Sequence, residues 1–354
     1  MINTESLGMV DPERMDPPDK PFSYFAHPND VLGAWGAPVA VEVTPEGYLY
    51  TGFGELMVFT GNPPEPVEAR IRTRNRGYLP VIEYDLDRDG VRYFFQCFAA
   101  DLGGDLRGMP VSFLRVTVTN TLTSEPRTPH VSAAWRFSAP ANAIYSRGVP
   151  DYRFRQKTEH LQRELVEGQT DYDPSWTYAW CSDALLRDDR MLYVFPTDPA
   201  PKRTMALGDA AVRMVRFFSG EVEGERGPGV AGSERQYHYD AHAPLGVTIY
   251  CLPLGAGQSR SLDFRLPLTP LPGDSSAASQ VRGADIDALF RETMAFWEGK
   301  VAAVAPFSFP EAKVQEYLLA NTVSNLLAID QIGDDTVVNV NKFQYHHWLS
   351  LIHI

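Results

Sequence analysis

The sequence has few of the features that mark secreted, membrane-spanning or metal-stapled proteins. Its three cysteines, Cys97, Cys181 and Cys251, are widely spaced and form no CxxC pair, so a disulfide framework or a zinc ribbon is not indicated. No apolar run approaches the roughly 20 residues that a membrane span needs. The first residues show neither the basic nor the apolar region of a signal peptide. These absences predict a cytoplasmic protein in a reducing compartment.

Positive charge is also scarce. The chain has 32 Lys and Arg against 45 Asp and Glu, which gives a net charge of -13. Such a surface repels phosphate groups, so we expect neither nucleic acid nor a membrane as a partner. A neutral or cationic ligand suits the charge better. Aromatic residues make up 12% of the chain, which fits sugar-binding surfaces and β cores alike.

A β pattern fills most of residues 36–268. In "FLRVTVTN", Leu114, Val116 and Val118 alternate with polar residues, which predicts a half-buried strand. "SLDFRLPL" (261–268) alternates in the same way, and Asp89-Gly90 supplies the turn of a predicted hairpin. About ten such segments without intervening helices predict an antiparallel sandwich.

The pattern changes after residue 268. Residues 269–281 are rich in Pro, Gly and Ser, which predicts a linker. Apolar residues at helical spacing follow from Ile286 to Val301, and a second helix is expected to begin at Pro310 and run to about Asp330. The predicted organisation is therefore a β domain over 1–268, a linker over 269–281 and a helical region over 282–354.

Two short motifs can be interpreted as sites or as ordinary structure. In "YHYDAH", a strand would place His238, Asp240 and His242 on one face, where they suit a divalent metal, or form a solvated strand edge. The solvated edge is favoured, and we expect no metal and no organic cofactor. In "DYDPSWTYAW" (171–180), the two tryptophans can stack on sugars or belong to the core, and the core is favoured.

The last residues, "NVNKFQYHHWLSLIHI", place an aromatic and hydrogen-bonding strip after the second helix. Tyr345, His346 and Trp348 are candidate sugar-binding residues in this strip. Taken by themselves, they are better explained as ordinary helix-start or core residues. No Gly-x-Ser-x-Gly motif and no cysteine motif indicates a nucleophile.

The order of segments resembles the bacterial six-hairpin glycosidases, the glucoamylase-like and glycoside-phosphorylase-like group. The segments that carry the resemblance are "TPEGYLYTGFGELMVFTG", "VSFLRVTVTNTL", "FWEGKVAAVAPFSFPEAKVQEYLLANTVSNLL" and "NKFQYHHWL". The resemblance implies an antiparallel β super-sandwich, a linker helix and the first helices of an (α/α)6 toroid. It also implies a sugar subsite at Trp348 and, less directly, at Tyr345 and His346.

In that family the last segment usually continues as Trp-x-Arg-Asp, whereas Leu349 is followed here by Ser350. We therefore expect a chain interrupted at the start of the toroid, with residues 350–354 foreign to the natural reading frame. The resemblance implies cleavage of a glycosidic bond by two carboxylic acids that are missing from this chain. Its partner would be an oligosaccharide or glycoside. The alternatives are a non-catalytic carbohydrate-binding β-sandwich module and a metal-binding β protein.

Overall fold

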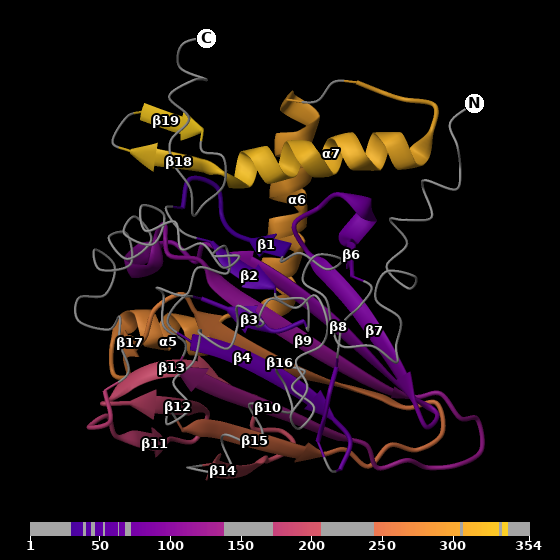
Figure 1. Ribbon diagram of the computed structural model, residues 1–354, viewed down its shortest axis with the longest axis vertical. Coiled ribbons are helices and arrows are strands. Elements are labelled where there is room, and N and C mark those ends of the chain that lie inside the picture. The colour runs from indigo at the N-terminus through magenta and orange to yellow at the C-terminus, as the bar shows by residue number, and fades with distance from the viewer. Residues whose placement is uncertain are drawn as a thin grey trace, which may run out of the picture.

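The structure, a computed structural model, describes residues 30–338 with gaps at 38–39, 44–46, 52–53, 63, 68–71, 138–172, 207–243, 305–306 and 333–334. The described part is mainly β. Two antiparallel sheets lie face to face, and three α-helices follow them in the chain (Figure 1). None of the helices in these residues is both long enough and apolar enough to cross a membrane.

The first sheet has the strand order β1-β2-β3-β4-β10-β15-β14, with β5 paired to β4. Its strands are β1 (Asp30–Leu32), β2 (Val41–Val43), β3 (Leu49–Tyr50), β4 (Gly54–Thr60), β5 (Glu65–Pro66), β10 (His130–Phe137), β14 (Lys202–Ala206) and β15 (Leu245–Cys251). The centre of the sheet is the long pairing of β4 with β10 and of β10 with β15.

The second sheet has the order β11-β12-β13-β16-β9-β8-β7-β6, with β17 paired to β13. Its strands are β6 (Thr73–Arg74), β7 (Ile82–Arg88), β8 (Val91–Ala100), β9 (Val111–Asn120), β11 (Tyr178–Trp180), β12 (Ala184–Arg187), β13 (Arg190–Val194), β16 (Ser259–Pro267) and β17 (Leu271–Pro272). Two short 3₁₀ helices, η2 (Asn75–Gly77) and η3 (Gly104–Leu106), lie between its strands.

The main core fills the space between the sheets. Alternate residues of the central strands point inward, as the sequence predicts, and those of β9 and β16 are fully or almost fully buried. From the first sheet, Leu56, Val58 and Trp135 reach the same core. The predicted hairpin is confirmed as β7–β8, and its turn residues Asp89 and Gly90 have φ of 49° and 73°.

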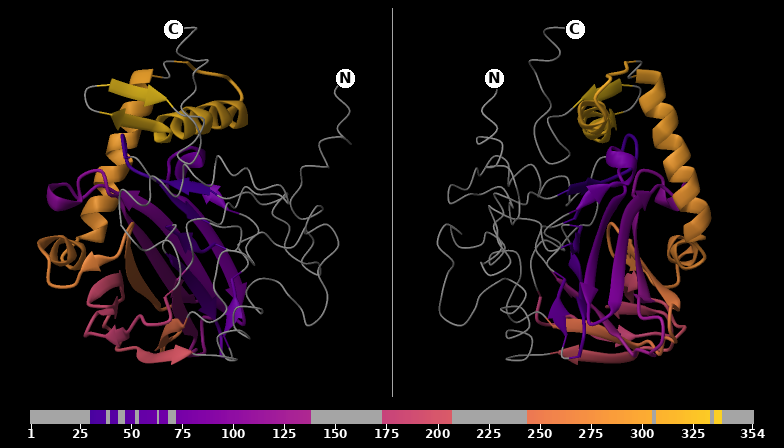
Figure 2. Two further views of the ribbon diagram at one scale, coloured as in Figure 1. Left: turned by 60° about the vertical axis from the view of Figure 1, so that its left-hand side comes forward. Right: turned by 90° about the vertical axis from the view of Figure 1, so that its right-hand side faces the viewer.

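Three helices follow the sheets: α5 (Ser276–Arg282), α6 (Ile286–Val304) and α7 (Ala312–Leu327). Helix α6 runs along the outer face of the second sheet, and α7 crosses the end of the sheets (Figure 2). A second apolar core joins them to that sheet, with Ile286, Met294, Trp297 and Val301 from α6. The amphipathic helix expected from Ile286 is thereby confirmed.

Two segments differ from the sequence-based expectation. Residues 269–281, expected as a linker, contain β17 and most of α5, because Ala277, Ala278 and Val281 are apolar enough to pack on the second sheet. After α7 the chain does not continue as a helix to Asp330 but forms a hairpin of β18 (Ile329–Ile332) and β19 (Asp335–Val338). The division into domains at residues 268 and 282 stays a prediction.

Gly54 supports a prediction about the packing of the neighbouring strands β4 and β10 in the first sheet. A Cβ at this position would overlap the buried indole of Trp135, whereas a Cβ at Gly299 in α6 would meet nothing within 4 Å. We expect Gly54→Ala to lower the free energy of unfolding by about 1–3 kcal/mol through overpacking. Gly299→Ala should raise it by about 0.5–1 kcal/mol, since alanine favours the helix.

Urea unfolding of both variants beside the wild-type chain measures the two shifts. A Gly54→Ala variant as stable as the wild type would contradict the close packing of β4 against Trp135.

Candidate functional site

The junction between the second sheet and α6 is the candidate functional site, because it joins the β part of the chain to its helices. Asp285 precedes α6, and its Oδ1 accepts a hydrogen bond of 3.0 Å from the backbone N–H of Ala288. A carboxylate in this position caps the helix. Asp287 follows in the first turn, where a negative charge is favoured by the helix dipole.

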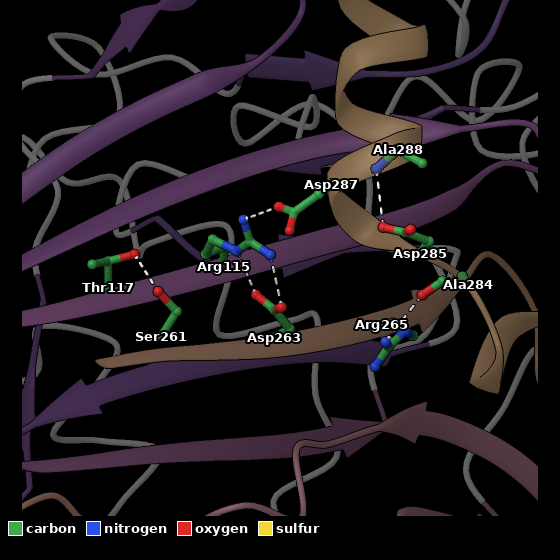
Figure 3. Close-up of polar contacts among 9 residues, drawn as sticks. All are labelled: Arg115, Thr117, Ser261, Asp263, Arg265, Ala284, Asp285, Asp287 and Ala288. Atoms are coloured by element: carbon green, nitrogen blue, oxygen red, sulfur yellow. Dashed lines mark hydrogen bonds and ion pairs between the residues drawn. The ribbon is translucent and has the colours of Figure 1, made fainter. Parts of the chain in front are cut away.

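Arg115 on β9 connects the sheet to this first turn (Figure 3). It lies opposite Asp263 of β16 and donates from Nε and Nη2 to both carboxylate oxygens, at 2.7 and 2.9 Å. Its Nη1 donates to Oδ1 of Asp287 at 2.5 Å. One guanidinium therefore joins β9, β16 and α6. Its pair with Asp263 is bidentate, the geometry that the planar guanidinium favours.

The two carboxylates hold the pKa of Arg115 above its ordinary value, chiefly through the hydrogen bonds with Asp263. Arg115 in turn lowers the pKa of Asp287, first by its hydrogen bond and then by its charge. Arg115 and Asp287 are therefore both charged near neutral pH. An aspartate held ionised in this way is a poor general acid. We therefore interpret Arg115, Asp263 and Asp287, called here the Arg115 cluster, as a structural connection between the sheet and α6.

Arg265 provides a second polar connection beside the first. It lies two residues along β16 from Asp263, and its Nη2 donates to the backbone oxygen of Ala284 at 3.1 Å (Figure 3). Burial lowers the pKa of Arg265. The chain is therefore held on both sides of the point where α6 begins.

Aromatic packing continues the junction along α6. Phe98 of β8 stacks on Phe113 of β9 with ring centroids 5.0 Å apart, and it meets the edge of Phe290 of α6 at 5.5 Å. Trp297, about two helical turns after Phe290, is 2% exposed. The covered half of the sheet is thus apolar, and the polar contacts of Arg115 lie at its border.

Helix α7 is attached at the edge of the second sheet that is formed by β6. Arg74 of β6 donates from Nη1 to the backbone oxygen of Ala320 at 3.0 Å and from Nη2 to Oγ of Ser324 at 3.1 Å. Arg76, in η2, forms an ion pair with Glu298 of α6. The loop between β6 and β7 therefore contacts both helices and fixes the angle between them.

Several apolar side chains are exposed, among charged ones, on the helices and in the segment between α6 and α7. Phe296 is 42% exposed, Phe309 43% and Tyr317 66%. Val304, Phe307 and Val314 are exposed as well. Within α7, Val323 and Leu326 are buried, whereas Val314 in the first turn is 38% exposed. The first turns of α7 and the preceding residues thus present an apolar surface to solvent.

The tryptophans of "DYDPSWTYAW" belong partly to the core. Trp176 stacks against the buried guanidinium of Arg187, 3.7 Å from its ring centroid, and Trp180 meets the edge of Phe195 at 5.7 Å. Both are half-buried against the main core. Asp173 accepts a hydrogen bond from the backbone of Ser175, as a turn residue does. These contacts favour the structural interpretation of the motif.

The sugar-binding candidates Tyr345, His346 and Trp348 lie outside the described residues, as do the metal candidates His238, Asp240 and His242. In the part of the chain that is described, no group of three or more His, Cys, Asp or Glu side chains is arranged to hold a metal ion. Burial raises the pKa of Cys97 to about 12, which makes it a poor nucleophile.

The junction residues were not singled out from the sequence. The alternation of "FLRVTVTN" and "SLDFRLPL" placed Arg115 and Asp263 on the outward faces of their strands, which is correct. Opposite charges on the outward faces of two predicted strands are the only signal that could have linked them. The pairing of the strands joins residues 148 positions apart.

Comparison with known proteins adds no family to this description. No model of a protein family matches the chain, and no curated protein matches it.

The Arg115 cluster leads to a prediction about pH. The pKa of Asp287 is lower in the folded chain than its ordinary value of 3.8. Its ion pair therefore stabilises the fold above pH 3.8, and this contribution is lost as the pH falls through the lower folded value. We expect Asp287→Asn to lower the free energy of unfolding at pH 7 by about 0.2–1 kcal/mol, since the pair is exposed.

The difference between Asp287→Asn and the wild type should vanish in acid, which urea unfolding at pH 7 and below pH 3.8 measures. Asp285→Asn is the matched control, since asparagine still caps a helix and the same charge is removed nearby. Equal losses in both variants at pH 7 would show that Arg115 gives Asp287 no special role.

Proposed function

We propose that the chain is the N-terminal part of a glycoside hydrolase or glycoside phosphorylase of the six-hairpin group. In this proposal the two sheets form the β super-sandwich, α6 is the linker helix and α7 is the first helix of an (α/α)6 catalytic toroid. The sandwich holds and orients the toroid. The proposal rests on the sequence resemblance together with the way in which the helices are attached.

One observation supports the proposal most directly. Helix α6 and the end of α7 are attached by apolar packing and by bonds from Arg74, Arg76 and Arg115, and Arg265 holds the residue Ala284 before α6. Phe296, Phe309 and Tyr317, in contrast, are exposed. Exposed apolar surface of this kind marks an interaction site. Further toroid helices packed on these side chains would cover it.

The proposed chemistry needs no organic cofactor and no metal. A carboxylic acid protonates the glycosidic oxygen, and a second carboxylate activates water, or phosphate attacks instead. By the resemblance, both carboxylates belong to later toroid helices outside this chain, so the chain by itself is catalytically inactive. Trp348, with Tyr345 and His346, would line the sugar subsite at the entrance of the toroid. The setting would be cytoplasmic and the ligand an oligosaccharide or glycoside.

The experiment compares the 354-residue chain with a version extended by the coding sequence downstream of Trp348 in its source DNA. Both are assayed on a panel of nitrophenyl α- and β-glycosides, with and without inorganic phosphate. We expect turnover only from the extended protein. Turnover by the shorter chain would place the acid and base within it. An extended protein that is inactive on every substrate would overturn the glycosidase proposal and favour a non-catalytic carbohydrate-binding module.

A further prediction concerns the exposed helix surface. If Phe309 and Tyr317 are sites for further helices, the 354-residue chain should self-associate and bind a hydrophobic dye. The double variant Phe309→Ser, Tyr317→Ser should reduce both by removing apolar surface. Size-exclusion chromatography with light scattering and dye fluorescence measure the change.

The matched control replaces Glu311 and Lys313 by serine, which alters exposed charged residues of the same region without changing its net charge. A chain that is monomeric and dye-free from the start would contradict the proposed covering of these helices.

A further inference from the structure

The outer face of the second sheet is divided into a covered half and an open half. On β8 the outward residues Phe98 and Ala100 are buried against the helical side, whereas Phe94 and Gln96 are half-buried and Arg92 is exposed. The same division occurs on β9, where Phe113 is buried but Thr117 is partly exposed. The Arg115 cluster marks the border, and Thr117 and Ser261 lie next to it on the same two strands (Figure 3), where Thr117 is partly exposed and Ser261 exposed.

A single row of side chains crosses the open half. Asp85 of β7 pairs with Phe94 of β8, Phe94 pairs with Thr117 of β9, and Thr117 pairs with Ser261 of β16. We call these four residues the Phe94 row. With neighbouring strands about 4.8 Å apart, the row spans roughly 14 Å. It is a nearly straight line of one carboxylate, one aromatic ring and two hydroxyls.

Phe94 is the unusual member of the row. Its chain neighbours Tyr93 and Phe95 point into the main core, but Phe94 points the other way. Within the described residues it packs on none of the three apolar clusters. A half-buried aromatic side chain that is surrounded by polar groups offers apolar area to a ligand with both apolar and polar surfaces.

The hydroxyl groups beside Phe94 are prearranged. Thr117 and Ser261 form a hydrogen bond of 2.9 Å, and Thr119 and Ser259 form one of 2.8 Å two residues further along both strands. Each hydroxyl has one donor and two acceptor positions. After its internal bond, each pair still has one O–H donor and three lone pairs available. Side chains already fixed by such bonds lose little freedom when a ligand binds.

The charges around the row select the ligand. Arg92 is paired with Asp85, and Arg115 with Asp263 and Asp287. Adjacent carboxylates on the same face, Glu83 and Asp87, leave an excess of negative charge. An anionic ligand is disfavoured there, and so is a phosphate backbone. A neutral ligand with many hydroxyl groups matches both the donors and the carboxylate acceptors.

We propose that the Phe94 row and the adjacent Thr119–Ser259 pair form a binding surface for a neutral oligosaccharide. One sugar ring lies on Phe94, and its hydroxyls bond to Thr117, Ser261 and the carboxylate of Asp85. The surface belongs to the sheet and not to the helices that would carry the catalytic carboxylates, so in this proposal it holds a glycan chain rather than cleaving it. The choice of a sugar among neutral polyhydroxyl compounds rests on the proposed function.

The experiment is affinity electrophoresis of the 354-residue chain in native gels that contain glycogen, mixed-linkage β-glucan or xylan, with heparin as an anionic polysaccharide. We expect retardation by at least one neutral polysaccharide and none by heparin. Phe94→Ala should weaken the binding roughly tenfold. Thr117→Val should also weaken it, because this variant removes a hydroxyl with almost no change of shape.

Thr322→Val is the matched control for Thr117→Val, since it removes a half-buried hydroxyl from α7, outside the Phe94 row. It should bind as the wild type does. Phe94→Trp keeps an aromatic surface and should retain binding, which separates loss of the ring from loss of the fold.

Three results would overturn the proposal: no retardation by any neutral polysaccharide, stronger retardation by heparin, or unchanged binding in both Phe94→Ala and Thr117→Val. These outcomes are independent of turnover. If the chain does not bind glycan at this surface, the glycosidase proposal is unaffected. If the extended protein is inactive but still binds glycan through Phe94, the glycosidase proposal is rejected and the binding-surface proposal is kept.

Discussion

The contact between α6 and the outer face of the second sheet is the constraint on which the rest of the structure depends. The side chains on the outer face of a sheet are buried only where another element packs on them. Here α5 and α6 cover part of the face, and α6 lies over Phe98 through Phe290 while Phe94 and Thr117 stay partly exposed. Arg115 stands at the border and bonds to the sheet through Asp263 and to the helix through Asp287. The position of α6 therefore decides both where the helical region lies and how much of the sheet solvent can reach.

The free energies of the contacts show that different interactions attach α6 to the sheet and determine its orientation. Full burial of a large apolar side chain contributes about 1.5–3 kcal/mol, and α6 buries Ile286, Met294, Trp297 and Val301. An exposed ion pair such as Arg115 with Asp287 contributes about 0–1 kcal/mol. Apolar packing thus supplies the attachment. Directional bonds from Arg115 and Arg265 to the start of the helix select one rotation and one position for it, which apolar contacts alone do not define.

The sequence was sufficient for the strands and for α6 because these are local patterns. Alternation in "FLRVTVTN" and "SLDFRLPL" gave the buried faces, and Asp89-Gly90 gave the turn of the β7–β8 hairpin. Composition was misleading at residues 269–281, where Pro, Gly and Ser occur beside the small apolar residues that let α5 pack closely. The Arg115 cluster and the Phe94 row could not be predicted, because each depends on which distant strands pair and in which register. A shift of one residue between β9 and β16 would remove both.

The two functional proposals use adjoining parts of one sheet face, and this proximity has a physical consequence. Asp263 and Thr117 belong to neighbouring parallel rows, so a glycan lying along the Phe94 row runs beside the guanidinium that bonds to α6. A ligand hydroxyl that bonds to Asp263 competes with Arg115, whereas one that bonds to Thr117 or Ser261 does not. Binding that avoids Asp263 leaves the helix contact intact, and the glycan then runs parallel to the border of the helix-covered half of the sheet. In a glycosidase, a surface in that position would keep a long substrate near the helical region without contributing any group to bond cleavage.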